Sequence, residues 1–61
     1  MAYHYYIVDH DAVARVDEKT LKGEMLGRDG KWRDADAMRI CNDGYEVSKK
    51  EALSWYAENP D

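Results

Sequence analysis

The first part of the chain carries bulky apolar and aromatic side chains at nearly every position. Segment 3–8 consists of tyrosine, histidine, isoleucine and valine, which suit a pleated, half-buried surface. Alternation along a strand places Tyr3, Tyr5 and Ile7 on one face. The other face then receives His4, Tyr6 and Val8. Because both faces carry apolar bulk, we expect this strand to lie inside a sheet.

Segment 9–16 predicts a turn and a return strand. A polar cluster at 9–11 has turn-forming composition. Residues 12–16, made of alanine, valine and arginine, then predict a second strand. Segment 17–22 fits a helical turn and a loop equally well, so its conformation stays open.

A hairpin is the clearest signal in the middle of the chain. Segments 24–28 and 31–34 flank Asp29-Gly30, a dipeptide that accepts the positive φ angles of a two-residue type I′ turn. The expected register pairs Arg28 with Lys31, Gly27 with Trp32 and Leu26 with Arg33.

A short helix is predicted after the hairpin. Asp34 is a suitable N-cap for a helix over 35–41. Segment 42–44, Asn-Asp-Gly, is a suitable stop, because asparagine and glycine tolerate the left-handed conformation at a helix C-terminus. A strand over 35–43 is the competing interpretation.

The C-terminal helix has stronger markers. Ser48 and Glu51 have the spacing of a capping box, in which the serine hydroxyl accepts from the Glu51 amide and the carboxylate reaches back. Val47 and Ala52 stand where a hydrophobic staple belongs. Pro60 predicts the end of the helix, because the residue before a proline disfavours helical geometry.

These elements predict the α+β class: a small antiparallel sheet of three or four strands with the C-terminal helix packed on one face. Sixty-one residues suffice for one domain, so 1–61 is taken as a single domain. The core is expected to be thin, because a chain of this length buries only about 60% of its unfolded surface.

Composition favours a soluble cytoplasmic protein. Cys41 is the only cysteine, so no internal disulfide can form, which fits a reducing compartment. We expect it to be a small buried thiol. The N-terminal residues lack the pattern of a signal peptide, and no apolar run approaches the length of a membrane span.

The charge argues against nucleic acid as the expected partner. Nine lysines and arginines stand against thirteen acidic residues, for a formal charge of −4. Binding to phosphates requires clustered cations.

No pattern in the chain predicts catalysis, and we therefore expect a non-enzymatic protein without cofactors. Cys41, His4 and His10 have no spacing that would join a thiolate to a base. The acidic and histidine residues match neither a calcium loop nor paired zinc ligands. The glycines do not form a phosphate-binding loop.

The aromatic residues carry the functional prediction. There are seven of them, five tyrosines and two tryptophans, and such side chains collect at interfaces because they keep a polar group. We expect a small interaction module that presents a sheet face and the hairpin tip to a protein partner or to another copy of itself. The predicted contact residues are Tyr3, Tyr5, Trp32 and Arg33. By analogy of size and charge alone, phage or mobile-element inhibitors of a host protein belong to this class.

Two other functions stay open. A single-stranded nucleic-acid-binding module would stack a base on Trp32 and contact phosphates with Arg28, Lys31 and Arg33. A purely structural domain would bury its aromatic residues and leave no apolar patch.

The capping box can be tested by Ser48→Ala. Loss of the cap should lower the free energy of unfolding by about 1 kcal/mol. Denaturant unfolding measures this quantity, and an unchanged midpoint would contradict the predicted cap.

Overall fold

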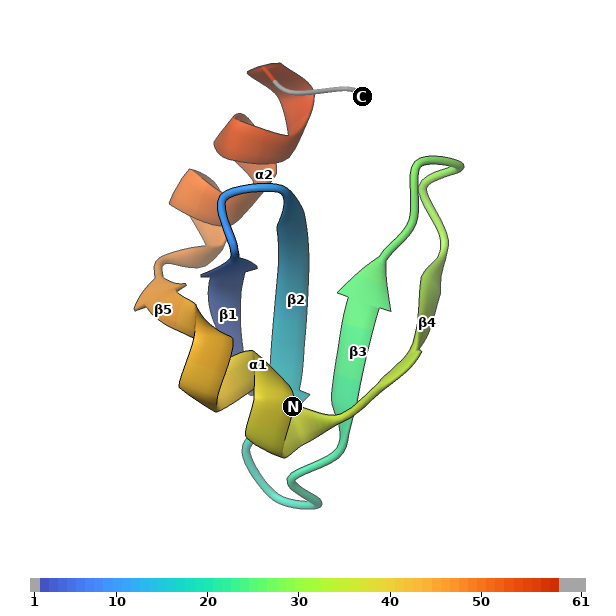
Figure 1. Ribbon diagram of the computed structural model, residues 1–61, viewed down its shortest axis with the longest axis vertical. Helices are drawn as coiled ribbons and strands as arrows, with labels where there is room; N and C mark the ends of the chain where they lie inside the picture. The colour runs from blue at the N-terminus through green and yellow to red at the C-terminus, as the bar shows by residue number, and fades with distance from the viewer. Residues whose placement is uncertain (1, 59–61) are drawn as a thin grey trace.

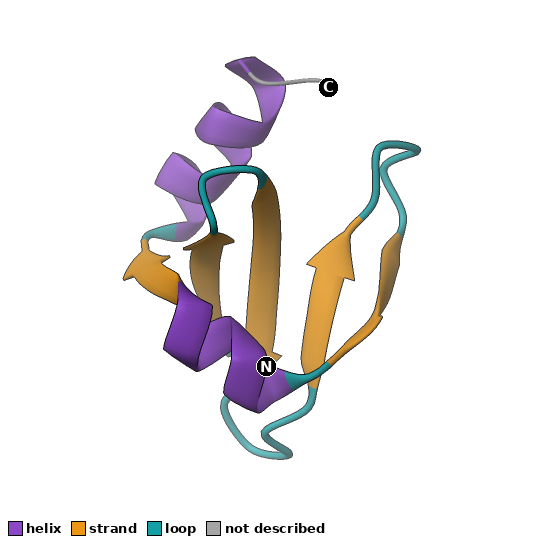
Figure 2. Ribbon diagram, viewed as in Figure 1, coloured by secondary structure: helices purple, strands orange, loops and turns teal. Residues whose placement is uncertain are grey.

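The computed structural model describes residues 2–58, which form one antiparallel sheet and two helices (Figures 1 and 2). The sheet has five strands in the order β4-β3-β2-β1-β5. In chain order the elements are β1 Tyr3–Val8, β2 Ala12–Asp17, β3 Gly23–Leu26, β4 Trp32–Ala35, α1 Ala37–Asp43, β5 Gly44–Val47 and α2 Lys49–Glu58. The predicted α+β class and antiparallel sheet are confirmed.

The prediction of three or four strands is wrong, because the chain forms a fifth strand over 44–47. β5 follows α1 without a loop and has only four residues, so it carries little alternation of its own. It forms against the second edge of β1, where Tyr5 pairs with Val47 and Ile7 with Tyr45. This pairing is a non-local contact that the local pattern does not reveal.

The two faces of β1 both lie in core clusters, as expected for an interior strand. On one face, a buried cluster consists of Tyr5, Val13 and Ala52. On the other face, the buried cluster consists of Val8, Ala14, Val16 and Ile40. The chain therefore builds two small cores, one on each side of the sheet.

Each core receives one fully buried side chain from a helix. Ile40 of α1 and Ala52 of α2 are both 0% exposed. Since they belong to different clusters, the helices lie on opposite faces of the sheet. Figure 2 shows α1 in front of the strands and α2, drawn paler, behind them.

The approach of α1 to the sheet depends on Gly23. A Cβ atom at this position would lie 2.8 Å from the Ala35 carbonyl oxygen, 2.9 Å from the Ala37 nitrogen and 2.9 Å from the Ile40 Cδ1. Real Cβ atoms are not found that close to backbone atoms. The missing side chain thus lets the start of α1 and its buried isoleucine pack against β3.

The bounds of α1 differ from the prediction at both ends. Asp34 lies in β4, and the N-cap is Asp36, whose Oδ1 accepts from the Met38 amide at 3.0 Å. The strand extends through Ala35 because that residue pairs with Gly23. At the other end, Gly44 does mark the stop but is extended (φ −108°) and begins β5, so the expected left-handed conformation is wrong.

The hairpin between β3 and β4 is present, but its predicted two-residue turn is wrong. The Gly27 amide donates to the Lys31 carbonyl at 2.9 Å, and the Gly30 amide donates to the Gly27 carbonyl at 3.0 Å. Trp32 consequently pairs with Leu26. The loop has three residues, 28–30, and only Gly30 takes a positive φ (82°). This form needs one left-handed residue where a type I′ turn needs two.

Asp17 ends β2 and organises the loop that follows it over 18–22. The Asp17 Oδ1 accepts from the amides of Lys19 and Thr20 at 2.8 and 3.0 Å. The Leu21 amide donates to the Asp17 carbonyl at 2.9 Å, with Leu21 at φ 61°. A bulky residue with a positive φ is an outlier, so the loop holds Leu21 in a strained conformation.

The start of α2 confirms the serine cap. The Ser48 Oγ accepts from the Glu51 amide at 3.1 Å. The Glu51 carboxylate contacts the Ser48 hydroxyl at 3.4 Å, whereas the capping-box prediction directed it to the Ser48 backbone amide. The predicted helix end at Pro60 lies outside the described residues.

The left-handed conformation of Gly30 predicts the response to substitution. Gly30→Val should destabilise the protein by roughly 1–2 kcal/mol or more, because an L-residue is strained at this φ. No atom lies within 4 Å of a Cβ built there, so the cost is conformational. Gly30→Asn is the matched control and should cost much less, since asparagine tolerates this region. Equal melting temperatures for both variants would contradict this account.

Candidate interaction surface

Three of the four predicted contact residues lie together around an arginine that the sequence analysis did not select. Tyr3 and Tyr5 project from the same face of β1, and Arg15 pairs with Tyr5 across the β1–β2 ladder. The Arg15 Cζ lies 4.1 Å from the ring centroid of Tyr3 and 4.0 Å from that of Trp32. We call Tyr3, Tyr5, Arg15 and Trp32 the aromatic–arginine cluster.

The rings of this cluster also contact one another. Tyr5 makes edge-to-face contacts with both Tyr3 and Trp32, at centroid distances of 6.3 Å in each case. This geometry is the favourable one for aromatic pairs. Tyr5 is buried, while Tyr3 and Trp32 are half-buried. Tyr5 therefore forms the buried part of the cluster. The rings of Tyr3 and Trp32 are partly exposed at the protein surface.

Glu24 holds the arginine in place. It is the cross-strand neighbour of Arg15 on β3, and its Oε1 accepts from the Arg15 Nε at 2.8 Å. Burial lowers the pKa of Arg15, but its hydrogen bonds with Glu24 and Tyr5 outweigh that effect, so the pKa is raised. The guanidinium stays charged and fixed against the two rings.

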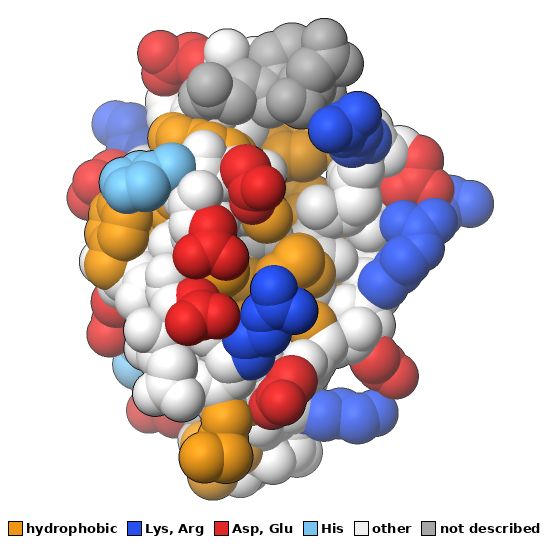
Figure 3. Space-filling model, in the orientation of Figure 1, with side chains coloured by type: hydrophobic (Ala, Val, Ile, Leu, Met, Phe, Trp, Pro, Cys, Tyr) orange, Lys and Arg blue, Asp and Glu red, His pale blue; other side chains and the backbone are white. Residues whose placement is uncertain are grey.

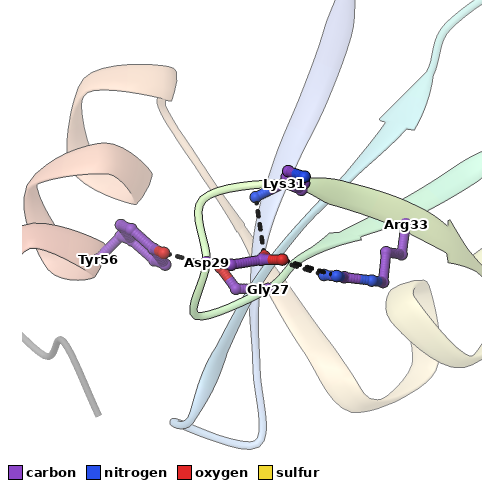
Figure 4. Close-up of polar contacts among 5 residues, drawn as sticks. All are labelled: Gly27, Asp29, Lys31, Arg33 and Tyr56. Carbon is purple, nitrogen blue, oxygen red and sulfur yellow. Dashed lines mark hydrogen bonds and ion pairs between the residues drawn. The ribbon is translucent and has the colours of Figure 1, made fainter.

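The second helix lies over the inner strands β1 and β2 of this sheet face. α2 packs on β1 and β2, on the same side as the cluster. It reaches the end of β3 through Tyr56, whose hydroxyl donates to the Gly27 carbonyl at 2.7 Å (Figure 4). Arg15, Glu24 and Trp32 nevertheless stay partly exposed: the side chains of Arg15 and Glu24 are 20% and 26% exposed, and Trp32 is half-buried.

Arg33, the fourth predicted contact residue, does not join the cluster. It follows Trp32 in β4, so its side chain leaves the opposite face of the strand. Its guanidinium instead binds Asp29 at the hairpin tip, with nitrogen–oxygen distances of 3.0 and 2.7 Å (Figure 4). The two halves of the predicted site are therefore separated by the sheet.

The hairpin tip is ordered by that ion pair. Asp29 Oδ1 also accepts from the Lys31 amide at 3.1 Å. The hydrogen bonds from Arg33 and then from the Lys31 amide lower the pKa of Asp29 to about 2. Asp29 thus closes the loop with the same carboxylate that binds the arginine.

Cys41 is exposed, so the expectation of a buried thiol is wrong. The residue follows Ile40 in α1, and one step along a helix turns it away from the face that packs on the sheet. Its Sγ contacts the Tyr6 hydroxyl at 3.8 Å. This hydrogen bond, together with burial, raises the pKa of Tyr6.

An apolar depression beside α1 is a second exposed feature. Its volume is about 320 Å³, and it is lined by Val16, Leu21, Ala37, Met38, Cys41 and Asn42. Leu21 is 68% and Met38 is 73% exposed. Figure 3 shows hydrophobic side chains at the lower end of this face of the molecule. No sequence signal marked this surface, because it depends on the strained loop conformation of Leu21.

The described part of the chain contains no group of three or more histidine, cysteine, aspartate or glutamate residues placed to hold a metal ion. Neither helix within residues 2–58 is long and apolar enough to cross a membrane. No protein-family description, curated protein or solved structure matches this chain.

The Asp29 ion pair predicts a pH response at the hairpin tip. The pKa of Asp29 is about 2 in the folded protein and about 3.9 in an unfolded chain. The stabilising contribution of the ionised Asp29 carboxylate is therefore fully present above about pH 4. It is lost as the pH falls through about 2. Carboxyl NMR titration should find Asp29 among the most acidic groups.

Arg33→Gln tests the cause of this shift. The substitution removes the guanidinium and leaves the Lys31 amide, so the pKa of Asp29 should rise toward the usual aspartate value. An unchanged Asp29 titration would show that Arg33 does not bind this carboxylate in solution.

Proposed function

We propose that the protein is a non-enzymatic interaction module that binds a protein partner through the aromatic–arginine cluster. The observation that carries this proposal is the position of Arg15, whose guanidinium lies over the rings of both Tyr3 and Trp32 on the same sheet face as α2. Tyrosine, tryptophan and arginine are the residues that most often dominate the binding energy of protein interfaces.

The rigidity of the cluster supports a binding role. Arg15 is held by Glu24, and Tyr5 is buried beneath the half-buried rings. Binding to a preordered surface loses less side-chain entropy than binding to mobile side chains. The cluster also offers two kinds of contact, an apolar ring surface and the charged pair of Arg15 with Glu24.

The hairpin tip is the second part of the proposed surface. Its loop is closed by Asp29, and its base is joined to α2 by the hydrogen bond from Tyr56 to Gly27. Arg28 and Lys31 are exposed there. A partner on the cluster side can reach the tip along β3 and β4, whereas Arg33 lies on the other face.

The geometry gives less support to single-stranded nucleic acid as the partner. Base stacking on Trp32 with phosphate contacts from Arg33 would need both side chains on one face of β4, and alternation separates them. The Arg33 charge is also paired with Asp29. The cation that lies over the Trp32 ring is Arg15, which is paired with Glu24.

A comparative capture experiment tests the proposed surface. The immobilised wild-type chain is compared with Trp32→Ala and Arg15→Lys, using lysate and then the purified partner. Arg15→Lys keeps the charge opposite Glu24 but loses the planar stack on the rings. We expect each substitution to weaken partner binding by roughly tenfold or more, as for a binding hot spot.

Arg39→Ala is the matched control. Arg39 is an exposed cation of α1, on the other side of the sheet, so its removal should leave partner binding unchanged. Circular dichroism establishes that all variants are folded. Equal capture by the wild type and all three variants would refute the assignment of binding to the cluster.

A further inference from the structure

The two outer strands of the sheet differ in what lies beside them. At the β5 end, the last turn of α1 lies against the strand, because the Gly44 amide donates to the Ile40 carbonyl. At the β4 end, no further strand within residues 2–58 pairs with the sheet, and Figure 1 shows no helix on the outer side of β4. An open strand edge can pair with another chain through its outward backbone groups. The outer edge of β4 is therefore a candidate site for an added strand.

The hydrogen-bonding pattern defines which backbone groups of β4 point outward. The Gly27 amide donates to the Lys31 carbonyl at 2.9 Å, and hydrogen-bonded pairs alternate along an antiparallel ladder. The odd-numbered residues of β4 consequently bond to β3, and the amide and carbonyl groups of Trp32 and Asp34 point away from it. Among residues 2–58, these outward groups have no hydrogen-bond partner.

The charges of β4 disfavour a second copy of this chain as the added strand. Antiparallel pairing of two identical strands puts one residue opposite itself, because the copies are related by a two-fold axis. A register centred on the middle of the strand opposes Arg33 or Asp34 to its own copy. A register centred on Trp32 opposes Arg33 to Lys31. Since like charges directly opposite each other are destabilising, we look for a different chain.

A row of three charged residues next to this edge indicates the chemistry of that chain. Asp34 lies opposite Glu24, which lies opposite Arg15, so their side chains share the face of the aromatic–arginine cluster. Glu24 binds the Arg15 Nε at 2.8 Å. The exposed Asp34 carboxylate has no ion pair or hydrogen bond within the described part of the chain. The row therefore holds two acids and one arginine.

The acidic pair is placed where its repulsion is strongest. Asp34 and Glu24 form a non-hydrogen-bonded pair, the kind in which side chains are closest. The arginine lies on the far side of Glu24, across from β4. A cation on a strand added beyond β4 would lie next to Asp34 and balance the second acid. The formal charge of −4 for the whole chain favours a partner of the same sign as that cation.

We propose that the β4 edge binds an extended segment of a protein partner, antiparallel to β4, with a lysine or arginine opposite Asp34. The segment forms backbone hydrogen bonds with Trp32 and Asp34, and its cation pairs with the Asp34 carboxylate. This inference rests on the proposed function, because Trp32 belongs both to this edge and to the aromatic–arginine cluster. It adds that the partner binds as a strand and that it carries a basic residue at a defined place.

A synthetic peptide, acetyl-Thr-Val-Thr-Lys-Thr-Val-Thr-amide, is the probe, and amide hydrogen exchange by NMR is the measurement. In the free protein, the amides of Trp32 and Asp34 should exchange much faster than those of Arg33 and Ala35, which bond to β3. At about 1 mM peptide, the amides of Trp32 and Asp34 should both become protected, because the peptide carbonyls accept from them.

Exchange of charges tests the place of the cation. Asp34→Lys should weaken binding of the lysine peptide by about tenfold or more, and it should instead bind a peptide with glutamate in place of that lysine. Binding of the glutamate peptide also shows that the variant is folded. Asp43→Lys is the matched control: it makes the same change of charge at the end of α1 that precedes β5, at the opposite end of the sheet. It should bind the lysine peptide as the wild type does.

Methylation of the peptide backbone tests the strand pairing itself. An N-methyl group on the lysine removes the amide that donates to the Asp34 carbonyl and should abolish protection of the β4 edge. An N-methyl group on the following threonine lies on the other edge of the peptide, because the pairs alternate. It should leave binding in place. Equal effects of the two methyl groups would contradict the proposed register.

Three other results overturn the proposal. The first is protection of the Trp32 and Asp34 amides in the free protein, and the second is a lysine peptide that leaves them unprotected. The third is a captured partner that requires Trp32 and Arg15 but binds Asp34→Lys without loss, which leaves the proposed function standing. Peptide protection at β4 together with capture that is insensitive to Trp32→Ala and Arg15→Lys supports the strand site and refutes the proposed function alone.

Discussion

Two helical side chains cover the two faces of one sheet, and the rest of the structure depends on that arrangement. β1 carries apolar residues on both faces, so neither face can be left to water. α1 supplies Ile40 to one side and α2 supplies Ala52 to the other. Both helices are short, and each packs through a single fully buried residue. The small size of these contacts explains why Gly23 matters: any side chain there would push α1 away from its face.

Local signals in the sequence identified most of the elements but not how they pair. The alternation of 3–8, the glycine of the β3–β4 turn and the serine cap at 48 each act over a few residues, and the structure contains all three. The fifth strand and the hairpin register depend on partners elsewhere in the sheet. β5 forms because β1 has a second edge, and Asp34 is not the N-cap of α1 because the Gly23–Ala35 pairing extends β4 past it.

The residues of the candidate surface were likewise predictable where a local pattern places them, but not where strand pairing does. Alternation correctly placed Tyr3 and Tyr5 on one face of β1, and Trp32 lies beside them. The sequence did not predict Arg15 as part of the surface, because its role depends on the β1–β2 and β2–β3 registers. These registers bring it between aromatic rings and opposite Glu24. Arg33 was grouped with Trp32 because they are adjacent in sequence, yet adjacency in a strand means opposite faces. The depression beside Leu21 had no sequence signal, since it depends on a backbone conformation that leucine rarely adopts.

The hydrogen bond from Tyr56 to the Gly27 carbonyl joins the last helix to the β3–β4 hairpin, two parts of the chain that are 29 residues apart. The outer hairpin and the terminal helix are the parts of a small domain most prone to open separately. Their connection means that neither can open without breaking a contact to the other. The hydrogen bond therefore couples local opening of the β3–β4 hairpin to local opening of α2.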